Sequence, residues 1–187
     1  MSRLRTAVFA PIGVLALLAS FAVPNLVDAK TSHERFSATL SGAQEVPPRT
    51  TSASGRGRTD LRDGNELRFD VQVRDIENVV VSHIHAGAPG VNGPVCVTLY
   101  GPVPPGGGRE NGLLANGTAT ALDPNVLQDN PPGVLAQCGG SFAGFLALHR
   151  AGNTYINVHT NDGDATPNEG PGDFPGGELR GQLLPRD

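Results

Sequence analysis

The sequence predicts an all-β fold, an antiparallel, immunoglobulin-like β-sandwich or a β-barrel of about eight short strands with one short helix. Short segments of alternating apolar and polar residues recur along the chain, with a turn signal after about every 8–12 residues. Glycine and proline, 25 and 16 of the 187 residues, fall mostly between these segments, where they form turns. Aromatic residues make up only 5% of the chain, which is untypical of a bundle of long helices.

The strands are predicted from alternation and from the turns that bound them. Residues 65–75 show the pattern best, because apolar side chains at every second position alternate with charged or amide side chains. An Asp-Gly dipeptide at 63–64 is a hairpin turn signal before them. The valine-rich segment 79–86 indicates a strand buried on both faces. The other predicted strands are 36–40, 52–61, 95–100, 113–122, 154–160 and 178–184.

One segment, residues 142–151, predicts a helix. Ser141 is a suitable N-cap before it, and Gly152 is a suitable left-handed residue after it. Its apolar stripe has the spacing i, i+3, i+4, i+7 and consists of Phe142, Phe145, Leu146 and His149. The remaining long segments, which are rich in glycine, proline or acidic residues, are expected to be loops: 101–112, 124–140 and 161–173.

The first 29 residues have the layout of a secretory signal peptide. Arg3 and Arg5 precede an apolar run over residues 7–23, and a small-residue cleavage pattern ends at Ala29. We expect cleavage there, which leaves one exported domain, residues 30–187, in a secreted or periplasmic location with no membrane contact. A retained signal that acts as a membrane anchor is the alternative.

Cys96 and Cys138 are the only two cysteines. In an oxidising compartment an even number of cysteines favours a disulfide. Cys96 lies in a predicted strand and Cys138 follows a long loop, so that a bond between them would pin the loop to the strand. The alternatives are two buried free thiols or a thiolate metal ligand.

Two histidines on one strand are the first candidate functional residues. Alternation places His83 and His85 on one face of strand 79–86, with their Cα atoms about 6.6–6.8 Å apart. Two imidazoles at this spacing can converge on one ion or one hydrogen-bond partner. Ile84 between them is expected to pack on the opposite face.

A second polar face is predicted on strand 154–160, where Tyr155, Asn157 and His159 alternate with apolar residues. If this strand lies in one sheet with strand 79–86, three histidines meet. Neutral imidazole suits copper(II) and zinc(II), and a site of three histidines leaves a position for water or another ligand. Three further residues are candidates for contacting the ligand side chains without binding the metal itself. They are Tyr155, Asn157 and His149, the last on the predicted helix.

Composition and motifs argue against several other functions. The net charge is −4, and no aromatic residues surround the basic segment 55–58, so nucleic acid is not expected as a partner. The chain lacks the Gly-x-Ser-x-Gly, Gly-x-x-x-x-Gly-Lys and His-Glu-x-x-His motifs. Segment 161–173 departs from the EF-hand pattern, since Pro167 replaces the required glycine and Asp173 replaces the final glutamate. We expect this segment to be solvated, with weak calcium binding at most.

Four motifs, which follow one another in order, resemble the CHRD domain family, named after chordin. The motifs are Phe-Ser-Ala-Thr-Leu-Ser-Gly-Ala-Gln-Glu-Val-Pro-Pro at 36–48, His-Ile-His-Ala-Gly with Gly-Val-Asn-Gly-Pro-Val at 83–95, Arg-Ala-Gly-Asn-Thr-Tyr-Ile-Asn-Val-His-Thr at 150–160 and Pro-Gly-Gly-Glu-Leu-Arg-Gly-Gln-Leu at 175–183. The resemblance implies an all-β extracytoplasmic domain, similar to the lone exported domains of microbes. The family pattern includes the positions of His83, His85 and His159, whereas the segment between Thr160 and Pro175 is longer here than is usual in the family.

Three functions follow from these residues. The favoured one is an exported, non-enzymatic module that binds copper or zinc through His83, His85 and His159. The alternative is a metal-free module in which the histidines organise loops for an extracytoplasmic protein or matrix partner. The third is an enzyme similar to copper/zinc superoxide dismutase, which needs more ligands than the two histidines left unassigned, His33 and His149. No catalytic residue is assigned.

Overall fold

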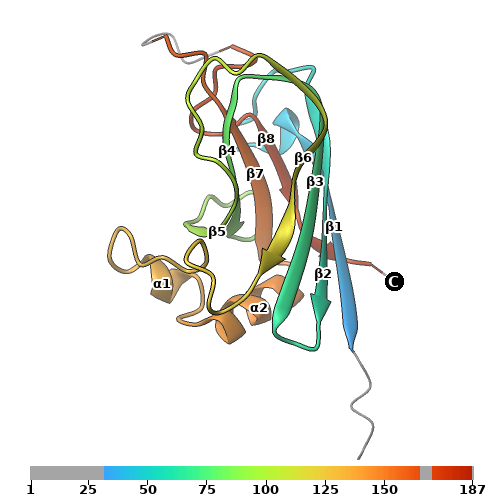
Figure 1. Cartoon of the computed structure of the whole chain (residues 1–187), viewed down its shortest axis with the longest axis vertical. Helices are drawn as coiled ribbons and strands as arrows, with labels where there is room; N and C mark the ends of the chain where they lie inside the picture. The colour runs from blue at the N-terminus through green and yellow to red at the C-terminus, as the bar shows by residue number, and fades with distance from the viewer. Residues whose placement is uncertain (1–31, 165–169, 187) are drawn as a thin grey trace, which may run out of the picture. The chain divides into compact units, whose positions relative to one another are not determined.

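Alternating apolar and polar residues, interrupted by glycine and proline turns, form strands that all join one antiparallel sheet (Figure 1). The structure is a computed structural model that describes residues 32–164 and 170–186. Its strands are β1 (His33–Ser41), β2 (Ser54–Arg62), β3 (Glu66–Glu77), β4 (Val79–Ala86), β5 (Val95–Tyr100), β6 (Arg109–Ala119), β7 (Thr154–Thr160), β8 (Leu179–Gln182) and β9 (Leu184–Pro185).

The sheet forms a nearly closed barrel. Its strand order is β5-β4-β7-β8-β1-β2-β3-β6, with β9 also paired to β1, so that β5 and β6 are the two edges (Figure 1). The all-β prediction is confirmed, and of its two forms the barrel is the one observed. The reason is that Ser41 on β1 pairs with Arg180 on β8. This pair joins the strands β5-β4-β7-β8 to the strands β1-β2-β3-β6 in one sheet.

The observed strands follow the predicted ones closely. β4, β5 and β7 begin and end where the sequence predicts. β6 starts earlier, inside the predicted loop 101–112, because Arg109 and Glu110 pair with the far end of β3 across an irregular register. The last predicted strand, 178–184, is divided into β8 and β9 at Leu183.

The inner faces of the strands enclose one hydrophobic core. On β3, Leu67 and Val71 are fully buried while Arg68 points to solvent, as the alternation predicts. Ile84 on β4 and Ile156 on β7 enter the same core. The other face of β4 and β7 is therefore left for their polar residues.

Strand β2 carries glycine where its inner face meets β7. A Cβ atom at Gly57 would collide with the Cδ1 atom of Ile156 on β7, so glycine is required for the close approach of the two strands. The neighbouring Arg56 and Arg58 are exposed on the outer face. The Gly-Arg alternation of this segment thus reflects a crowded inner face and a charged outer one.

Helix α2 (Phe142–Arg150) lies at one end of the barrel and confirms the predicted helix (Figure 1). The Ser141 hydroxyl accepts a hydrogen bond of 3.1 Å from the Gly144 N–H, and Gly152 has the predicted left-handed backbone, with φ +70°. The predicted stripe is buried and consists of Phe142, Phe145, Leu146 and His149.

The predicted loop 124–140 contains the single-turn helix α1 (Val134–Gln137), which is too short to show a periodic pattern. Cys138 follows this turn and forms a disulfide with Cys96 on β5, which confirms the predicted bond. Val97 also forms an isolated bridge with Val126. The disulfide and the bridge hold this segment against the edge strand β5.

The predicted signal peptide, residues 1–29, lies outside the described residues, as does part of the acidic segment 161–173. In the part of the chain that the structure describes, no helix combines the length and the apolar character needed to cross a membrane.

Replacing both cysteines by alanine (C96A/C138A) is expected to lower the free energy of unfolding by about 2–4 kcal/mol. The bond joins residues that are 42 positions apart, and it restricts the unfolded chain over that whole length. Urea denaturation measures the loss, and wild-type protein under reducing conditions should match the variant. A loss below about 0.5 kcal/mol, the usual size of a neutral surface substitution, would contradict this expectation.

Candidate metal centre

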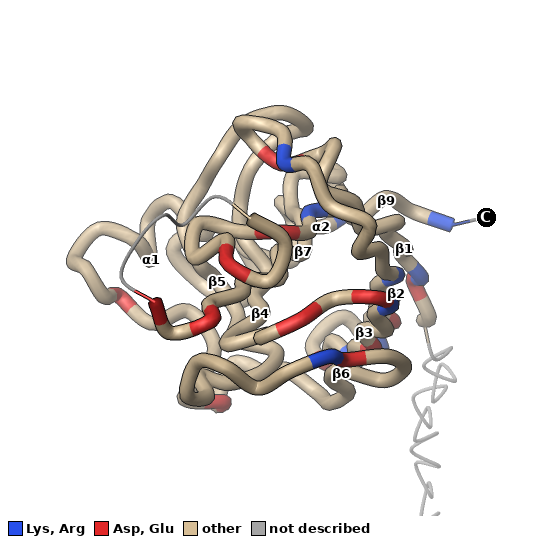
Figure 2. The backbone as a smooth tube through the Cα atoms, turned by 90° about the horizontal axis from the view of Figure 1, so that it is seen from above, with Lys and Arg blue, Asp and Glu red and all other residues tan. Residues whose placement is uncertain are grey.

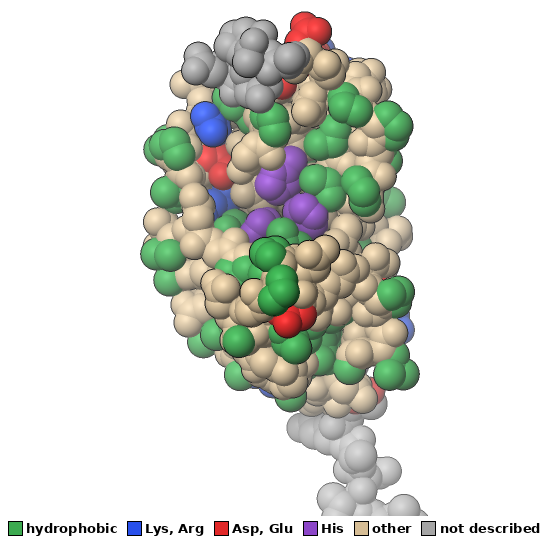
Figure 3. Space-filling view, turned by 90° about the vertical axis from the view of Figure 1, so that its left-hand side faces the viewer, with side chains coloured by type: hydrophobic (Ala, Val, Ile, Leu, Met, Phe, Trp, Pro, Cys, Tyr) green, Lys and Arg blue, Asp and Glu red, His purple; other side chains and the backbone are tan. Residues whose placement is uncertain are grey.

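The register between β4 and β7 places the polar residues of both strands on one outer face. His83 lies opposite Asn157, and His85 lies opposite Tyr155, in an antiparallel ladder. His159 is therefore diagonal to His83, two residues further along β7. The three histidines that the sequence predicts as ligands are brought together, and Figure 3 shows histidine side chains gathered near the middle of this face.

The spacing of the histidine nitrogens suits one metal ion. One ring nitrogen from each of His83, His85 and His159 lies within 4.8 Å of the other two. His83 Nδ1 and His159 Nε2 are 3.4 Å apart. Since metal–imidazole bonds are about 2.0–2.1 Å, a tetrahedral ion separates its nitrogen ligands by about 3.3–3.4 Å. This pair already has that spacing.

In two of the three rings, a backbone carbonyl group determines which nitrogen keeps a free lone pair. His85 Nδ1 lies 2.9 Å from the Gly93 carbonyl oxygen, and His159 Nδ1 lies 2.9 Å from the Pro175 carbonyl oxygen. A carbonyl only accepts, so each Nδ1 carries the hydrogen and each Nε2 keeps its lone pair. His85 Nε2 is buried and has no hydrogen-bond partner among the described residues. An unpaired buried lone pair among two other imidazoles is what a metal ligand requires.

Burial keeps the three imidazoles neutral. It lowers the pKa of His83 to about 3 and that of His85 to about 4, and it also lowers the pKa of His159. The neighbouring histidines lower the pKa of His83 further, because a proton on one ring opposes a proton on the next. At neutral pH the site therefore presents lone pairs rather than positive charges.

Tyr155 and Arg180 position His85 and the loop that contacts it. The Tyr155 ring stacks on His85 with a centroid separation of 4.9 Å, and the Arg180 guanidinium lies 3.5 Å from the Tyr155 ring centre. Arg180 also donates hydrogen bonds to the Asn92 side chain and to the Val91 and Ala88 carbonyl groups. It thereby holds the segment that supplies the Gly93 carbonyl to His85.

Glu178 secures the segment that supplies the second carbonyl. Its fully buried carboxylate accepts hydrogen bonds from the Thr51 and Thr160 hydroxyls and from the Gly172 N–H, all at 2.6–2.8 Å. These contacts fix both sides of the turn in which Pro175 binds His159. Arg180 and Glu178 both fall in the last family-like motif, but no spacing rule in the sequence indicates what they contact.

Glu45 is a further buried acid that the sequence did not single out. It follows the short 3₁₀ turn η1 (Gly42–Gln44), and its Oε2 accepts a 3.4 Å hydrogen bond from Asn157 Nδ2. Glu45 Oε1 and Asn157 Oδ1 have no partners among the described residues. Both lie beside Gly177, where a Cβ atom would be 2.8 Å from Glu45 Oε1 and 2.5 Å from Asn157 Oδ1.

Burial raises the pKa of Glu45 to about 7, although the charges of Arg180 and Arg49 oppose this effect. A proton on Oε1 would supply the donor that the two partnerless oxygens lack. Asn157, predicted to contact the metal ligands, donates a hydrogen bond to Glu45 and lies opposite His83 in the ladder of β4 and β7. The only sequence signal for Glu45 is its place in the Gln-Glu-Val-Pro-Pro motif.

His149 does not contact the candidate site, contrary to the prediction from sequence. Its Nε2 is hydrogen-bonded to the Thr59 hydroxyl at 2.9 Å and its Nδ1 to the Thr154 hydroxyl at 2.8 Å. Its ring packs against Phe36 and Phe145 inside the barrel. The sheet separates it from the three histidines, because the stripe of α2 is buried in the core and the ligand residues lie on the outer face.

The remaining candidates lie apart from the triad. His33 is exposed at the start of β1, where it pairs with Asp60. Within residues 32–164 and 170–186, the triad is the one group of three or more close histidine, cysteine or acidic side chains. The calcium-binding alternative for segment 161–173 therefore has no such cluster in its described part.

The fold and this site define a class of protein, a β-barrel module with three converging histidines on its outer face. Residues 36–167 match the CHRD domain, and the chain belongs to this family. CHRD domains are typically extracellular, which agrees with the disulfide between Cys96 and Cys138. A comparison with curated proteins gives no match.

The variant Glu45→Gln is expected to gain stability relative to wild type as the pH rises. The wild-type carboxyl has a folded pKa of about 7 against an ordinary value of 4.5, so the folded state holds its proton between these values and loses stability as the pH rises through them. The neutral amide of the variant has no such loss. Between pH 5 and 8 the difference in unfolding free energy should shift by about 2–3 kcal/mol in favour of the variant.

Parallel urea denaturation of both proteins at each pH measures this shift, and subtraction cancels the titration of the histidines that both share. A difference that stays constant from pH 5 to 8 would show that Glu45 ionises in the folded protein as it does in the unfolded chain.

Proposed function

We propose that this protein is a secreted or periplasmic binding module that holds one copper or zinc ion on His83, His85 and His159. Two observations on His85 carry the proposal. Its buried Nε2 has no partner in the described structure, and one of its ring nitrogens lies within 4.8 Å of a nitrogen from each of the other two rings. In two of the three rings, Nδ1 donates a hydrogen bond to a backbone carbonyl group, as is usual for histidines that bind metals through the other nitrogen.

The donor set favours copper or zinc over other ions. Three neutral imidazoles suit these borderline ions, whereas calcium and magnesium prefer carboxylate and carbonyl oxygens. The two cysteines are bonded to each other and supply no thiolate. Three nitrogen ligands leave a coordination position for water or an incoming group. When bound, the ion would replace the contact between His83 Nδ1 and His159 Nε2.

A binding module is favoured over an enzyme similar to superoxide dismutase. Such an enzyme needs a second set of ligands, and His149 is committed to two threonine hydroxyls on the other side of the sheet. The metal-free alternative, in which the histidines serve a protein or matrix partner by organising loops, leaves the buried His85 nitrogen unexplained. Export is supported by the family and by the disulfide.

Calorimetric titration of the purified, chelator-treated protein with copper(II) and zinc(II) tests the proposal. We expect one ion per chain, and at least about 100-fold weaker binding in the H83A/H85A variant, because two of three ligands are removed. His33→Ala is the matched control, since this histidine is exposed and pairs only with Asp60 among the described residues. Unchanged affinity in H83A/H85A, or no stoichiometric binding by the wild type, would refute the proposal and favour the metal-free module.

The affinity should depend little on pH. The folded pKa values of His83 and His85, about 3 and about 4, lie well below 6.5, so these ligands are already deprotonated at pH 5.5. We expect the dissociation constant to change less than about threefold between pH 7.5 and 5.5, whereas solvent-exposed histidines would lose about tenfold per ligand. Titrations across this range measure the change, and a loss above about 100-fold would contradict the buried, neutral site.

A further inference from the structure

The outer face of β1, β2 and β3 carries a concentration of arginines that the metal site does not use. Side chains that point outward on these strands alternate between basic and acidic or polar groups, as the registers show. We call this surface the arginine face, and its basic residues are Arg35, Arg56, Arg58, Arg62, Arg68, Arg74 and Arg186. Figure 2 shows basic positions gathered around β1, β2 and β9, although the chain as a whole has a net charge of −4.

Several of these arginines are uncommitted. Arg62 pairs with Asp60 and Arg68 pairs with Glu66. For Arg35, Arg58 and Arg186, no ion pair or side-chain hydrogen bond occurs within the described residues. Their guanidinium groups therefore keep their donors free for a ligand.

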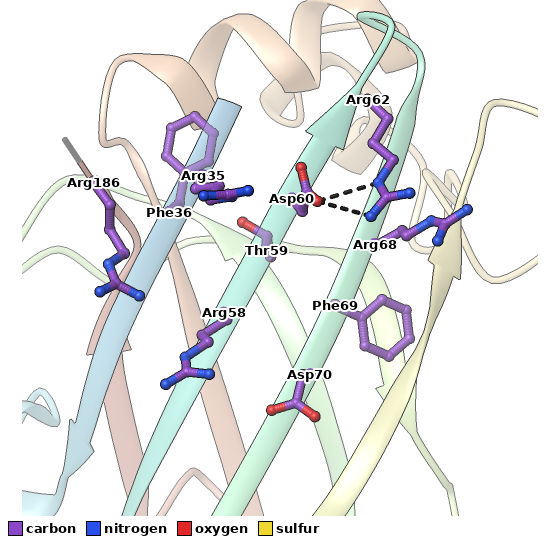
Figure 4. A pocket seen from close by; sticks show the side chains of 10 residues that line it. All are labelled: Arg35, Phe36, Arg58, Thr59, Asp60, Arg62, Arg68, Phe69, Asp70 and Arg186. Atoms are coloured by element: carbon purple, nitrogen blue, oxygen red, sulfur yellow. Dashed lines mark hydrogen bonds and ion pairs between the residues drawn. The ribbon is translucent and has the colours of Figure 1, made fainter. Parts of the chain in front are cut away.

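The uncommitted arginines surround a shallow hollow of about 380 Å³. Figure 4 shows Arg35, Arg58 and Arg186 on the same outward side of the sheet, with Asp60 between Arg35 and Arg62 and with Asp70 on the strand next to Arg58. A neighbouring hollow of about 290 Å³ shares Arg58 and Arg186 and extends to Arg56. The two hollows adjoin as one track, and the β2 residues that line it, Arg56 to Arg62, span about 20 Å at about 3.3 Å per residue.

The chemistry of the track favours an anionic polymer that is also rich in hydroxyl groups. Lys30 is the only lysine of the chain, so every fixed positive charge on this face is a guanidinium, which binds carboxylates and phosphates alike through two parallel hydrogen bonds. Asp60 and Asp70 lie beside the arginines, where they can accept hydrogen bonds from hydroxyl groups. This alternation fits a chain of sugars with carboxylates separated by hydroxyls.

Nucleic acid fits the same surface less well. Its sugars offer fewer hydroxyl groups to the aspartates, and single strands need successive aromatic side chains for base stacking. Phe36, which lines the hollow, is 3% exposed, and Phe69, which also lines it, is partly buried against the core. The hollow therefore offers one partly covered ring, whereas single strands stack successive bases on several aromatic side chains.

We propose that the arginine face binds an acidic polysaccharide with uronate carboxylates, along the track formed by Arg35, Arg56, Arg58 and Arg186. This inference is independent of the metal centre, which lies on β4 and β7. The four guanidinium groups would contact carboxylates, while Asp60 and Asp70 would accept hydrogen bonds from sugar hydroxyls between them.

Binding of the purified protein to polygalacturonate at about 100 mM salt, measured by biolayer interferometry, tests this proposal. We expect saturable binding that the fully methyl-esterified polymer does not show, because the ester removes the charge and keeps the sugar backbone. The R58Q/R186Q variant should bind at least about tenfold more weakly, since both charge-assisted contacts are lost.

The matched control is R49Q/R109Q, which removes the same charge from residues that do not line the track. Equal weakening of both double variants would show attraction to overall charge rather than to this face, and would overturn the proposal. So would a lack of saturable binding, or stronger binding of a single-stranded oligonucleotide than of polygalacturonate. Circular dichroism melts of both variants check that each is folded during the assay.

Discussion

The antiparallel pairing of β4 with β7 is the constraint on which the candidate metal centre depends. One register sets two faces at once, because neighbouring residues of a strand point to opposite sides. Ile84 and Ile156 enter the core, and the same pairing brings the histidines of both strands together outside it. A slip of one residue would expose the isoleucines and bury the histidines, so the burial of apolar side chains holds the histidine triad in place.

The polar groups around this site are held by loops that lie far away in the sequence. Arg180 and Glu178 are buried, and their hydrogen bonds offset the cost of removing charge from water. The bonds also fix the two carbonyl groups that orient His85 and His159. By contrast, the partnerless atoms of His85 and Glu45 lie at the candidate site and its neighbourhood. Partnerless buried oxygens also occur on Asp173 and Gln182, so the unpaired His85 nitrogen supports the proposed metal site through its place beside two other imidazoles.

The barrel presents different chemistry on different parts of its circumference. β4 and β7 carry neutral imidazoles beneath loops, whereas β1 to β3 carry exposed guanidinium groups. Gly57 shows how the two parts are linked, because it lets β2 approach Ile156 on β7 from within while its neighbours Arg56 and Arg58 stay outside. A polymer on the arginine face would leave the histidine face open, so one module can hold an ion and a matrix at the same time.

The sequence by itself determined which side chains share a face. Alternation placed His83, His85 and His159 correctly, and the helical stripe and the disulfide followed from local pattern and cysteine count. Only the tertiary structure decided between barrel and sandwich, assigned Glu45 and placed His149 in the core. The physical reason is that a local pattern predicts only which face of its own strand or helix a side chain lies on. What it then meets depends on pairings and loops that are 40 to more than 100 residues away, such as the contact of Asn157 with a residue 112 positions earlier in the chain.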